Sequence, residues 1–264
     1  MAEKMTFKKL AISMSFAVFV VYGVLILSLF YFYNGQLFLE TLTSERTLFS
    51  IRLSLFTATV ATLISVFFAI PSAYALSRFR FPGRQMIDTI LELPMIISPV
   101  ALGAVVLIFF NTPPGIFVQG KGIQFVFTIY GIFLAQFITT VGISIRLIKA
   151  AMDEIPVRYE EVARTLGASP AKAFFTVTIP LSKKGIIAAS ILTWAKALGE
   201  FGATITIAGS MAMKTETIPI AIFMRLASAD IEGTVVLVLI LITIGLGTLY
   251  GVRLLTRKAT ALIR

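Results

Sequence analysis

The stretch "EVARTLGASPAKAFFTVTIP", residues 161–180, lies between two long apolar runs, yet it has the pattern of two short helices in water. From Arg158 onward, apolar residues recur at the three-and-four spacing of one helix face: Tyr159, Val162, Ala163 and Leu166. Three charged residues fall off this apolar face: Glu160, Glu161 and Arg164.

The residues that follow are typical of a sharp corner between helices. Gly167 can end the first helix in a left-handed conformation, Ser169 is a good N-cap, and Pro170 suits the first position of the next helix. The second helix has its own shared face: Ala171, Phe174, Phe175 and Thr178. We expect Pro180 to stop it. The stretch therefore predicts two short helices outside a bilayer.

The rest of the chain is too apolar for a water-soluble domain. Of its 264 residues 58% are hydrophobic and only 14% are charged, and the mean hydropathy is +0.94. This composition predicts an integral membrane protein. The chain has no cysteine and no histidine, which excludes disulfides, thiolate or imidazole metal sites and Cys or His nucleophiles. We therefore expect no metal site and no catalytic residue.

A helix needs about 20 apolar residues to cross a bilayer, and six runs are long enough. They span residues 10–33, 53–76, 89–110, 123–145, 185–208 and 234–252. We interpret residues 1–264 as one all-α transmembrane domain of six helices. Residues 149–182 form the connection between the fourth and fifth helices, and this connection carries the corner.

Basic residues concentrate in alternate connections, as the positive-inside rule describes. With a cytoplasmic N-terminus, most of the 23 Lys and Arg residues fall inside. The terminal groups are Lys4, Lys8 and Lys9, and Arg253, Arg257, Lys258 and Arg264. Both termini and the corner are therefore predicted to be cytoplasmic. Because the basic residues are dispersed over four segments, the net charge of +10 reflects topology and argues against nucleic-acid binding.

Prolines interrupt two of the predicted spans, Pro71 in the second and Pro94 and Pro99 in the third. Each removes a backbone donor, so the kinks fit a moving transporter or the ordinary tolerance of proline in membrane helices equally well. Outside the spans, residues 112–122 predict a turn-rich loop. Residues 218–224 predict a short helix at the outer interface.

The corner places apolar side chains where no lipid covers them, Leu166, Phe174 and Phe175 among them. An apolar face rimmed by charge is typical of a protein contact. The alternative is that the corner folds back on its own membrane domain, and the pattern alone favours neither.

The corner resembles the cytoplasmic "EAA" loop of the small six-span permeases of ATP-binding-cassette importers. The family pattern is Glu-Ala-Ala, three residues, Gly, nine residues, Ile, any residue, Leu-Pro. Glu161, Ala163, Gly167 and Pro180 match it in register, and three apolar residues depart from it: Val162, Val177 and Ile179. The stretches "SLFTATVATLISVFFAIPSAYALSRFRFPGR" (54–84) and "LELPMIISPVALG" (91–103) also look like this family, so the resemblance covers nearly the whole chain.

The resemblance implies that the corner docks in a cleft of a separate ATPase subunit. This chain has no G-x-x-x-x-G-K-[ST] phosphate loop, so we expect a transport subunit and no enzyme, with ATP and Mg held by the partner. Glu161 and Arg164 would fix register with partner charges. The implied coupling residues are Glu160, Glu161, Ala163, Arg164, Leu166, Gly167, Phe174, Phe175 and Pro180.

The resemblance also implies the rest of the assembly. It is a homodimer with the passage on its two-fold axis, two ATPase subunits and an extracytoplasmic binding protein that delivers an oxyanion. Transport would proceed by alternating access. The chain would be a multi-pass protein of the prokaryotic cytoplasmic membrane, surrounded by lipid.

The cargo is suggested by Gly-Glu-Phe-Gly-Ala-Thr, residues 199–204, and by "KTETIPIAIF", residues 214–223. Both resemble the molybdate and tungstate branch of these importers, while sulfate and thiosulfate permeases share the Gly-Glu-Phe-Gly core. Sulfate or thiosulfate is thus the alternative cargo. An ion-driven secondary transporter is a weaker alternative, because the spans hold few ionisable residues.

Two ionisable residues, Lys196 and Glu200, fall within the predicted fifth span at i and i+4. Such a pair is either a structural pair inside the bundle, which we favour, or a polar element of the passage. Gly199 and Gly202 could allow close helix packing, which we favour, or could bend the span, and Thr204 and Thr206 offer hydroxyl groups suited to an oxyanion. The candidate set is Lys196, Gly199, Glu200, Gly202, Thr204 and Thr206.

Overall fold

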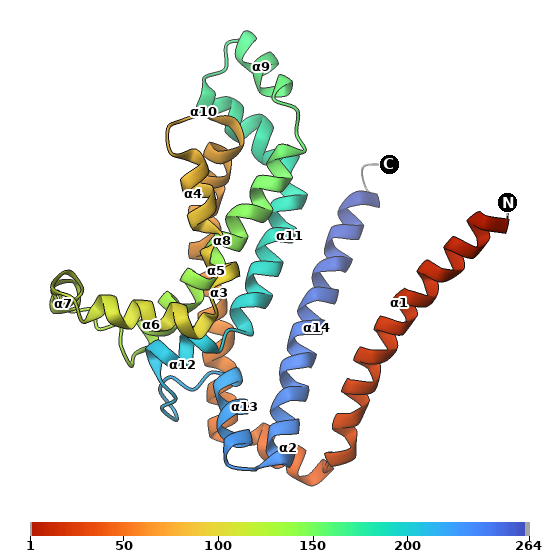
Figure 1. Ribbon diagram of the computed structural model, residues 1–264, viewed down its shortest axis with the longest axis vertical. Helices are drawn as coiled ribbons and strands as arrows, with labels where there is room; N and C mark the ends of the chain where they lie inside the picture. Colours follow the sequence, from red (N-terminus) through yellow and green to blue (C-terminus); the bar gives the residue numbers. More distant parts are fainter. Residues whose placement is uncertain (1, 262–264) are drawn as a thin grey trace.

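The computed structural model describes residues 2–261, and the described chain is built of helices without strands (Figure 1). Side chains are described from residue 7 to residue 251. Lys4, Arg253, Arg257 and Lys258 therefore fall outside the described side chains, and Arg264 lies outside the described residues. That residues 1–264 form a single permease domain stays a prediction.

Five described helices are long and apolar enough to cross a membrane, or six if one sharply bent pair is a single span. This confirms the all-α membrane class. In chain order the elements are α1 (Ala2–Ser28) with a 3-10 turn (Leu29–Phe32), α2 (Gly35–Thr43), α3 (Glu45–Arg78), α4 (Arg84–Leu91), α5 (Leu93–Ile96), α6 (Pro99–Phe110), α7 (Pro113–Gly120), α8 (Ile129–Asp153), α9 (Arg158–Thr165), α10 (Pro170–Ala173), a π-helical turn (Phe174–Thr178), α11 (Ile179–Leu198), α12 (Gly202–Ala208), α13 (Ile218–Ala227) and α14 (Ile231–Ala261).

The centre of the bundle is the contact between α3 and α8. Small side chains let the helices approach closely, and four fully buried alanines lie on α3: Ala58, Ala61, Ala69 and Ala73. Buried polar groups pair across the contact. Ser65 Oγ lies 3.0 Å from Thr140 Oγ1, and Gln136 Nε2 donates to Thr57 Oγ1 at 3.3 Å. Close packing and hydrogen bonds therefore hold α3 and α8 together where lipid offers no hydrophobic drive.

The direction of the two terminal helices bears on the topology. The first turn of α1 and the last described turn of α14 point toward the same end of the molecule as α9 (Figure 1). α1 stands apart from the bundle, with none of the apolar window in Phe7–Phe32 buried. This arrangement agrees with an even number of crossings. The predicted cytoplasmic side of that end stays a prediction.

The third predicted span, residues 89–110, is broken and is not one continuous helix. The chain bends by 114° between its two parts, Arg84–Ile96 and Pro99–Phe110. Ser98 precedes Pro99, whose ring pushes it into an extended conformation (φ −61°, ψ 146°). Ser98 Oγ then accepts the Ala101 N–H at 3.3 Å and starts α6 as a new helix. The Ser-Pro pair thus turns an expected kink into a break.

The fifth predicted span, residues 185–208, is also wrong as a single helix. α11 ends at Leu198, and α12 begins at Gly202 in a different direction (Figure 1). α12 crosses α6 closely: a Cβ on Gly202 would lie 3.0 Å from Pro99 Cβ, and one on Gly103 would lie 2.7 Å from Thr206 Cβ. The two interrupted spans therefore meet each other, through glycines that leave room for neighbouring backbone and side chains.

The remaining differences concern helix ends and loops. α8 starts at Ile129 and continues to Asp153, so the predicted fourth span of 123–145 is shifted and the connection 149–182 begins inside α8. The predicted loop 112–122 contains α7, whose first positions are prolines. A proline is tolerated there because the first N–H groups of a helix have no partner within the helix, so the missing N–H costs nothing. The predicted helix at 218–224 is confirmed as α13, and Pro71 lies inside α3 without ending it.

Candidate functional site

The first half of the corner, residues 158–170, has the predicted geometry. Gly167 is left-handed, with φ +89°. The Ala168 N–H donates to Ala163 O, and the Gly167 N–H donates to Arg164 O, each at 3.0 Å, which is the double bond pattern of a glycine-ended helix. Ser169 Oγ accepts the Lys172 N–H at 3.2 Å and caps α10. The prediction of a glycine stop followed by a serine cap is confirmed.

The second half of the corner differs from the prediction, because Pro180 does not end the helix. α10, the π-helical turn and α11 form one apolar helix, Pro170–Leu198. In the π-helical turn the Ile179 N–H donates to Phe174 O, five residues back. We attribute the tolerance of Pro180 to this wider turn, since a proline ring ordinarily clashes with the carbonyl four residues earlier. The corner is therefore attached directly to a spanning helix.

One surface of the corner is apolar and exposed. Leu166 is 84% exposed and Phe175 is 66% exposed, and Tyr159 and Val162 are exposed as well. Glu161 and Arg164 are also exposed. Phe174 behaves differently: it is partly buried, and its ring centroid lies 4.4 Å from that of Tyr74 on α3. Of the two predicted phenylalanines, only Phe175 is free to meet another protein.

Glu160 is buried, although the helical spacing places it off the apolar face of α9. Only 7% of the residue is exposed. Its Oε1 accepts hydrogen bonds from Arg78 Nε and Thr178 Oγ1, each at 2.7 Å, and its Oε2 accepts one from Tyr74 OH at 2.8 Å. The carboxylate therefore joins α9 to α3 and to the π-helical turn. Helical spacing could not indicate this, because the partners lie 18, 82 and 86 residues away.

Arg78, the last residue of α3, is the other half of this cluster. Its Nη2 donates to Met152 O at 3.0 Å and to Ile155 O at 2.9 Å, carbonyls at and just beyond the end of α8. A cation at a helix C-terminus is favourable because the last carbonyls carry partial negative charge. Sequence reasoning assigned Arg78 only to the topology. The four residues Tyr74, Arg78, Glu160 and Thr178 are called the Glu160 cluster below.

Electrostatics keep the Glu160 carboxylate charged. Burial acts to raise the pKa of Glu160, and the hydrogen bonds from Thr178, Arg78 and Tyr74 act to lower it. The hydrogen bonds and the positive charge of Arg78 outweigh burial, so the pKa lies below its ordinary value of 4.5. At neutral pH the cluster therefore contains a complete ion pair.

The predicted pair in the fifth span forms across a helix end. Lys196 Nζ lies 3.6 Å from Glu200 Oε2, but Glu200 follows the end of α11. Glu200 is 1% exposed, and its Oε1 accepts the Ala203 N–H of α12 at 3.0 Å. Its Oε2 is buried without a hydrogen bond in the described structure. The carboxylate thus also stabilises the start of α12.

The other candidate residues of this segment lie around the same break. Gly199 is the C-cap residue directly after α11, and Gly202 packs against Pro99 and Val100 of α6. Thr206 Oγ1 donates to Gly202 O at 2.7 Å within α12. Thr204 is fully buried, and its hydroxyl lacks a hydrogen bond in the described part of the chain. Whether these residues line a passage stays a prediction.

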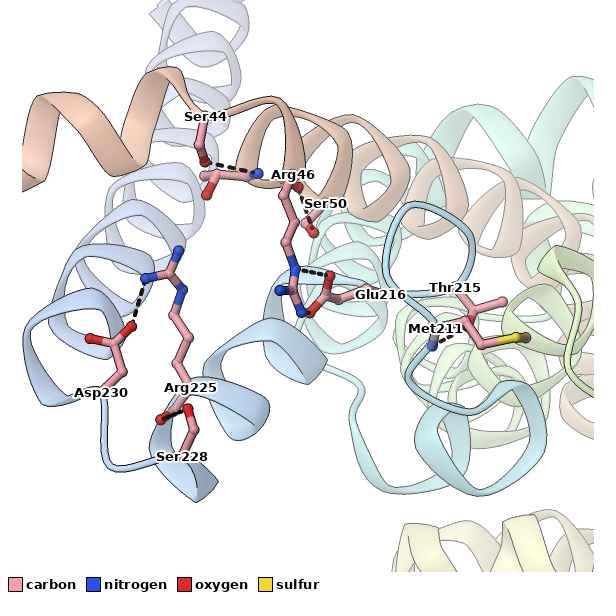
Figure 2. Close-up of polar contacts among 10 residues, drawn as sticks. Ser44, Arg46, Ser50, Met211, Thr215, Glu216, Arg225, Ser228 and Asp230 are labelled. Carbon is pink, nitrogen blue, oxygen red and sulfur yellow. Dashed lines mark hydrogen bonds and ion pairs between the residues drawn. The ribbon is translucent and has the colours of Figure 1, made fainter.

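A second polar region, which sequence reasoning missed, lies at the opposite end from α9. Figure 2 shows Arg46 of α3 directed at Glu216, in the segment before α13, with N–O distances of 2.7 and 2.6 Å. The Ile218 N–H donates to Ser54 Oγ at 2.8 Å. Nearby, Arg225 Nη1 donates to Asp230 Oδ2 at 2.8 Å (Figure 2). Polar contacts therefore hold the segment 211–218 against α3.

Neither region resembles a metal site. Among the described residues, no group of three or more acidic side chains lies close enough to hold a metal ion. The described site has the features of a protein contact: an exposed apolar corner, charged residues at its rim and a buried ion pair beneath it.

Comparisons with known proteins agree with this picture. Residues 61–260 match the family described as "Binding-protein-dependent transport system inner membrane component". The molybdenum transport system permease protein ModB of Escherichia coli K12 is 37% identical over 177 residues, covering 66% of this chain and 77% of that protein. The sulfate transport system permease protein CysT of Salmonella typhimurium LT2 is 30% identical over 221 residues, covering 83% and 80%.

Two solved structures share the fold. A chain of a bacterial alginate ABC transporter, in complex with a periplasmic protein carrying an alginate pentasaccharide, matches with a TM-score of 0.78 at 17% identity, covering 97% of this chain and 95% of that chain. A chain of the MetNI methionine ABC transporter matches with a TM-score of 0.61 at 16% identity, covering 82% and 99%. At these identities the likeness shows the fold alone.

Proposed function

This chain belongs to the family of inner-membrane components of binding-protein-dependent transport systems, and we propose that its cargo is molybdate or tungstate. It is a permease subunit of an ABC importer, a multi-pass protein of the cytoplasmic membrane. The cargo, the partners and the roles of individual residues are the finer parts of the proposal.

The order of sequence identities is the observation that supports molybdate or tungstate as the cargo. The molybdenum permease ModB is 37% identical to this chain, and the sulfate permease CysT is 30% identical. The Gly-Glu-Phe-Gly-Ala-Thr segment at 199–204 builds the break between α11 and α12. The segment thus belongs to the part of the bundle where two interrupted spans meet, and in secondary transporters such interrupted helices surround the substrate site.

The partner proposed for the corner is an ATPase subunit that binds ATP and Mg. The exposed Leu166 and Phe175 would supply the docking area, and the exposed Glu161 and Arg164 would fix register. Gly167 holds the turn between them. In a homodimer two such corners would engage two ATPase subunits, and an extracytoplasmic binding protein would deliver the oxyanion to the opposite end.

Transport would follow from alternating access around the two-fold axis. Closure of the ATPase subunits would bring the two corners together and open the passage outward, and release after hydrolysis would open it inward. Lys196, Gly199, Glu200, Gly202, Thr204 and Thr206 are the proposed elements near the passage. Because the Glu200 carboxylate is neutralised by Lys196 and the α12 backbone, it would repel a dianion less than a free carboxylate.

The test is reconstitution of the permease with its ATPase subunit and binding protein in vesicles. Labelled molybdate should accumulate only with ATP, vanadate should abolish accumulation, and an excess of tungstate should compete more strongly than an excess of sulfate. Elemental mass spectrometry of the binding protein should find molybdenum or tungsten. Uptake at the full rate without a nucleotide-hydrolysing partner would disprove motor-driven transport.

Sulfate is the second candidate, and one observation favours it. The sulfate permease CysT aligns over 83% of this chain, whereas ModB aligns over 66%. Stronger competition by sulfate or thiosulfate than by tungstate in the same vesicles would select this cargo and keep the permease role.

A further inference from the structure

The corner has a buried anchor beneath an exposed surface. Most of the α9 side chains, among them Tyr159 and Val162, are exposed. Glu160 alone is buried on this helix. Its carboxylate accepts three hydrogen bonds from side chains of α3 and the π-helical turn. In the described structure, the side-chain attachment of α9 to the spanning helices therefore concentrates in one residue.

The anchor continues through Arg78 to a third spanning helix. Arg78 donates to Glu160 through Nε and to the carbonyls of Met152 and Ile155 through Nη2. Hydrogen bonds thus run without interruption from the end of α8, through the end of α3, to α9 and on to Thr178. Only 6% of the Arg78 side chain and 9% of the Glu160 side chain are exposed, so water competes little for these bonds.

The bond to Thr178 joins the anchor to the π-helical turn. Thr178 is the last residue of the turn, which precedes Pro180 at the start of α11. A π-helical turn is less favourable than an α-helical one, and it persists where other contacts hold it. The Thr178–Glu160 bond is such a contact, so α9 and the first turns of α11 are held in one relative position.

From these contacts we infer that Glu160 is a positioning residue of the transport cycle. The Glu160 cluster makes α9 move as one body with the cytoplasmic ends of α3 and α8 and with the start of α11. Force applied to the exposed surface of α9 then displaces the spanning helices and is not absorbed by flexing of residues 154–157. This inference rests on the proposed function, since the force is that of the ATPase subunit.

The variant Glu160→Gln tests the anchor with little change of shape. The tyrosine and threonine hydroxyls can rotate to pair with an amide, but the Arg78 guanidinium can only donate and loses its charged acceptor. The matched control is Glu154→Gln. It makes the same change at an exposed position directly after α8, at the same end of the bundle. Thr178→Val removes only the bond to the π-helical turn.

The first measurement is the number of molybdate ions transported per ATP hydrolysed by the reconstituted complex. We expect Glu160→Gln to lower this ratio by on the order of threefold to thirtyfold, with the ATPase subunit still co-purifying. Glu154→Gln should retain the wild-type ratio, and Thr178→Val should fall between the two. A wild-type ratio in Glu160→Gln would overturn the inference.

The second measurement needs neither a partner nor a known cargo. The chain has no native cysteine, so spin labels can be placed at Thr165→Cys and Ala150→Cys, two exposed positions on α9 and α8. The distance distribution between them should be narrow in the native sequence and with Glu154→Gln, and broad with Glu160→Gln. Equally narrow distributions in all three would overturn the inference, even if the vesicles proved sulfate to be the cargo.

Discussion

Arg46 and Glu216 form a two-pronged ion pair that joins the first turn of α3 to the segment before α13. Arg46 Nε lies 2.7 Å from Glu216 Oε2, and Arg46 Nη2 lies 2.6 Å from Oε1. The arginine side chain is 55% exposed, whereas the glutamate side chain is 1% exposed. The glutamate would thus lose the cation that offsets its burial if the arginine were removed.

The first prediction is that Arg46→Gln destabilises the protein by about 2 kcal/mol, the usual size of a lost hydrogen bond to a charged group. The measurement is the midpoint of thermal unfolding in detergent. Arg52→Gln is the control, because Arg52 is an exposed arginine on the same helix and should leave the midpoint nearly unchanged. Equal shifts in the two variants would show that the ion pair adds nothing.

The second prediction concerns the pH dependence of stability. The pKa of Glu160 is lower in the folded protein than its ordinary value of 4.5. A carboxyl with a lowered folded pKa stabilises the fold fully above its unfolded pKa, and this contribution is lost as the pH falls through the folded value. The Glu160 cluster should therefore stabilise the protein at neutral pH and fail under acid conditions.

The unfolding midpoints of the native protein and of Glu160→Gln over a pH series measure this contribution. The difference between the two should stay constant from about pH 8 to about pH 6 and narrow below the ordinary pKa of a glutamate. A difference that grows on acidification would mean that Glu160 is uncharged in the fold.

Local sequence patterns predicted the parts of this protein that depend on local chemistry. Ser169 and Gly167 act on their own backbone neighbours, so their roles as helix cap and helix stop could be predicted from residue type. Long apolar runs likewise predicted the membrane class, because bilayer thickness sets the length of a span.

Tertiary contacts account for what the patterns did not predict. Hydropathy cannot distinguish a continuous span from two half-helices, so the sequence predicted at most a kink or a bend where the chain breaks after Ile96 and after Leu198. Glu160 lies in a charged stretch with Arg158 and Glu161, and only the approach of Arg78 from the end of α3 makes it a buried residue. Glu216 was missed for the same reason, because its partner Arg46 is 170 residues away.

The third prediction tests the crossing of the two broken spans. A Cβ at Gly103 would lie 2.7 Å from Thr206 Cβ and 3.2 Å from Ala203 Cα. Gly103→Ala should therefore destabilise the protein by about 1 to 3 kcal/mol through overpacking. Gly245→Ala is the control, since a Cβ there meets nothing within 4 Å. Unfolding midpoints measure both variants, and Thr206→Gly should restore part of the loss in Gly103→Ala. Two neutral glycine variants would argue against close packing of α6 on α12.

The fourth prediction separates folding from coupling at the corner. Phe175 is exposed, so Phe175→Asp should leave membrane insertion and the unfolding midpoint intact. It should nevertheless weaken association with the ATPase subunit and uncouple hydrolysis from uptake, because an interface centre loses apolar area and gains a charge. Phe175→Leu keeps the apolar area and should retain coupling.

Gly167→Pro should uncouple hydrolysis by a different route. A proline cannot adopt the φ of +89° found at Gly167, and it removes the N–H that donates to Arg164 O. The glycine stop would be lost, and α9 would meet the ATPase subunit at a changed angle while the spans stay inserted. Substrate-stimulated ATP hydrolysis and uptake, measured together in vesicles, check both variants. Unchanged stimulation in Phe175→Asp and Gly167→Pro would place the coupling surface elsewhere on the protein.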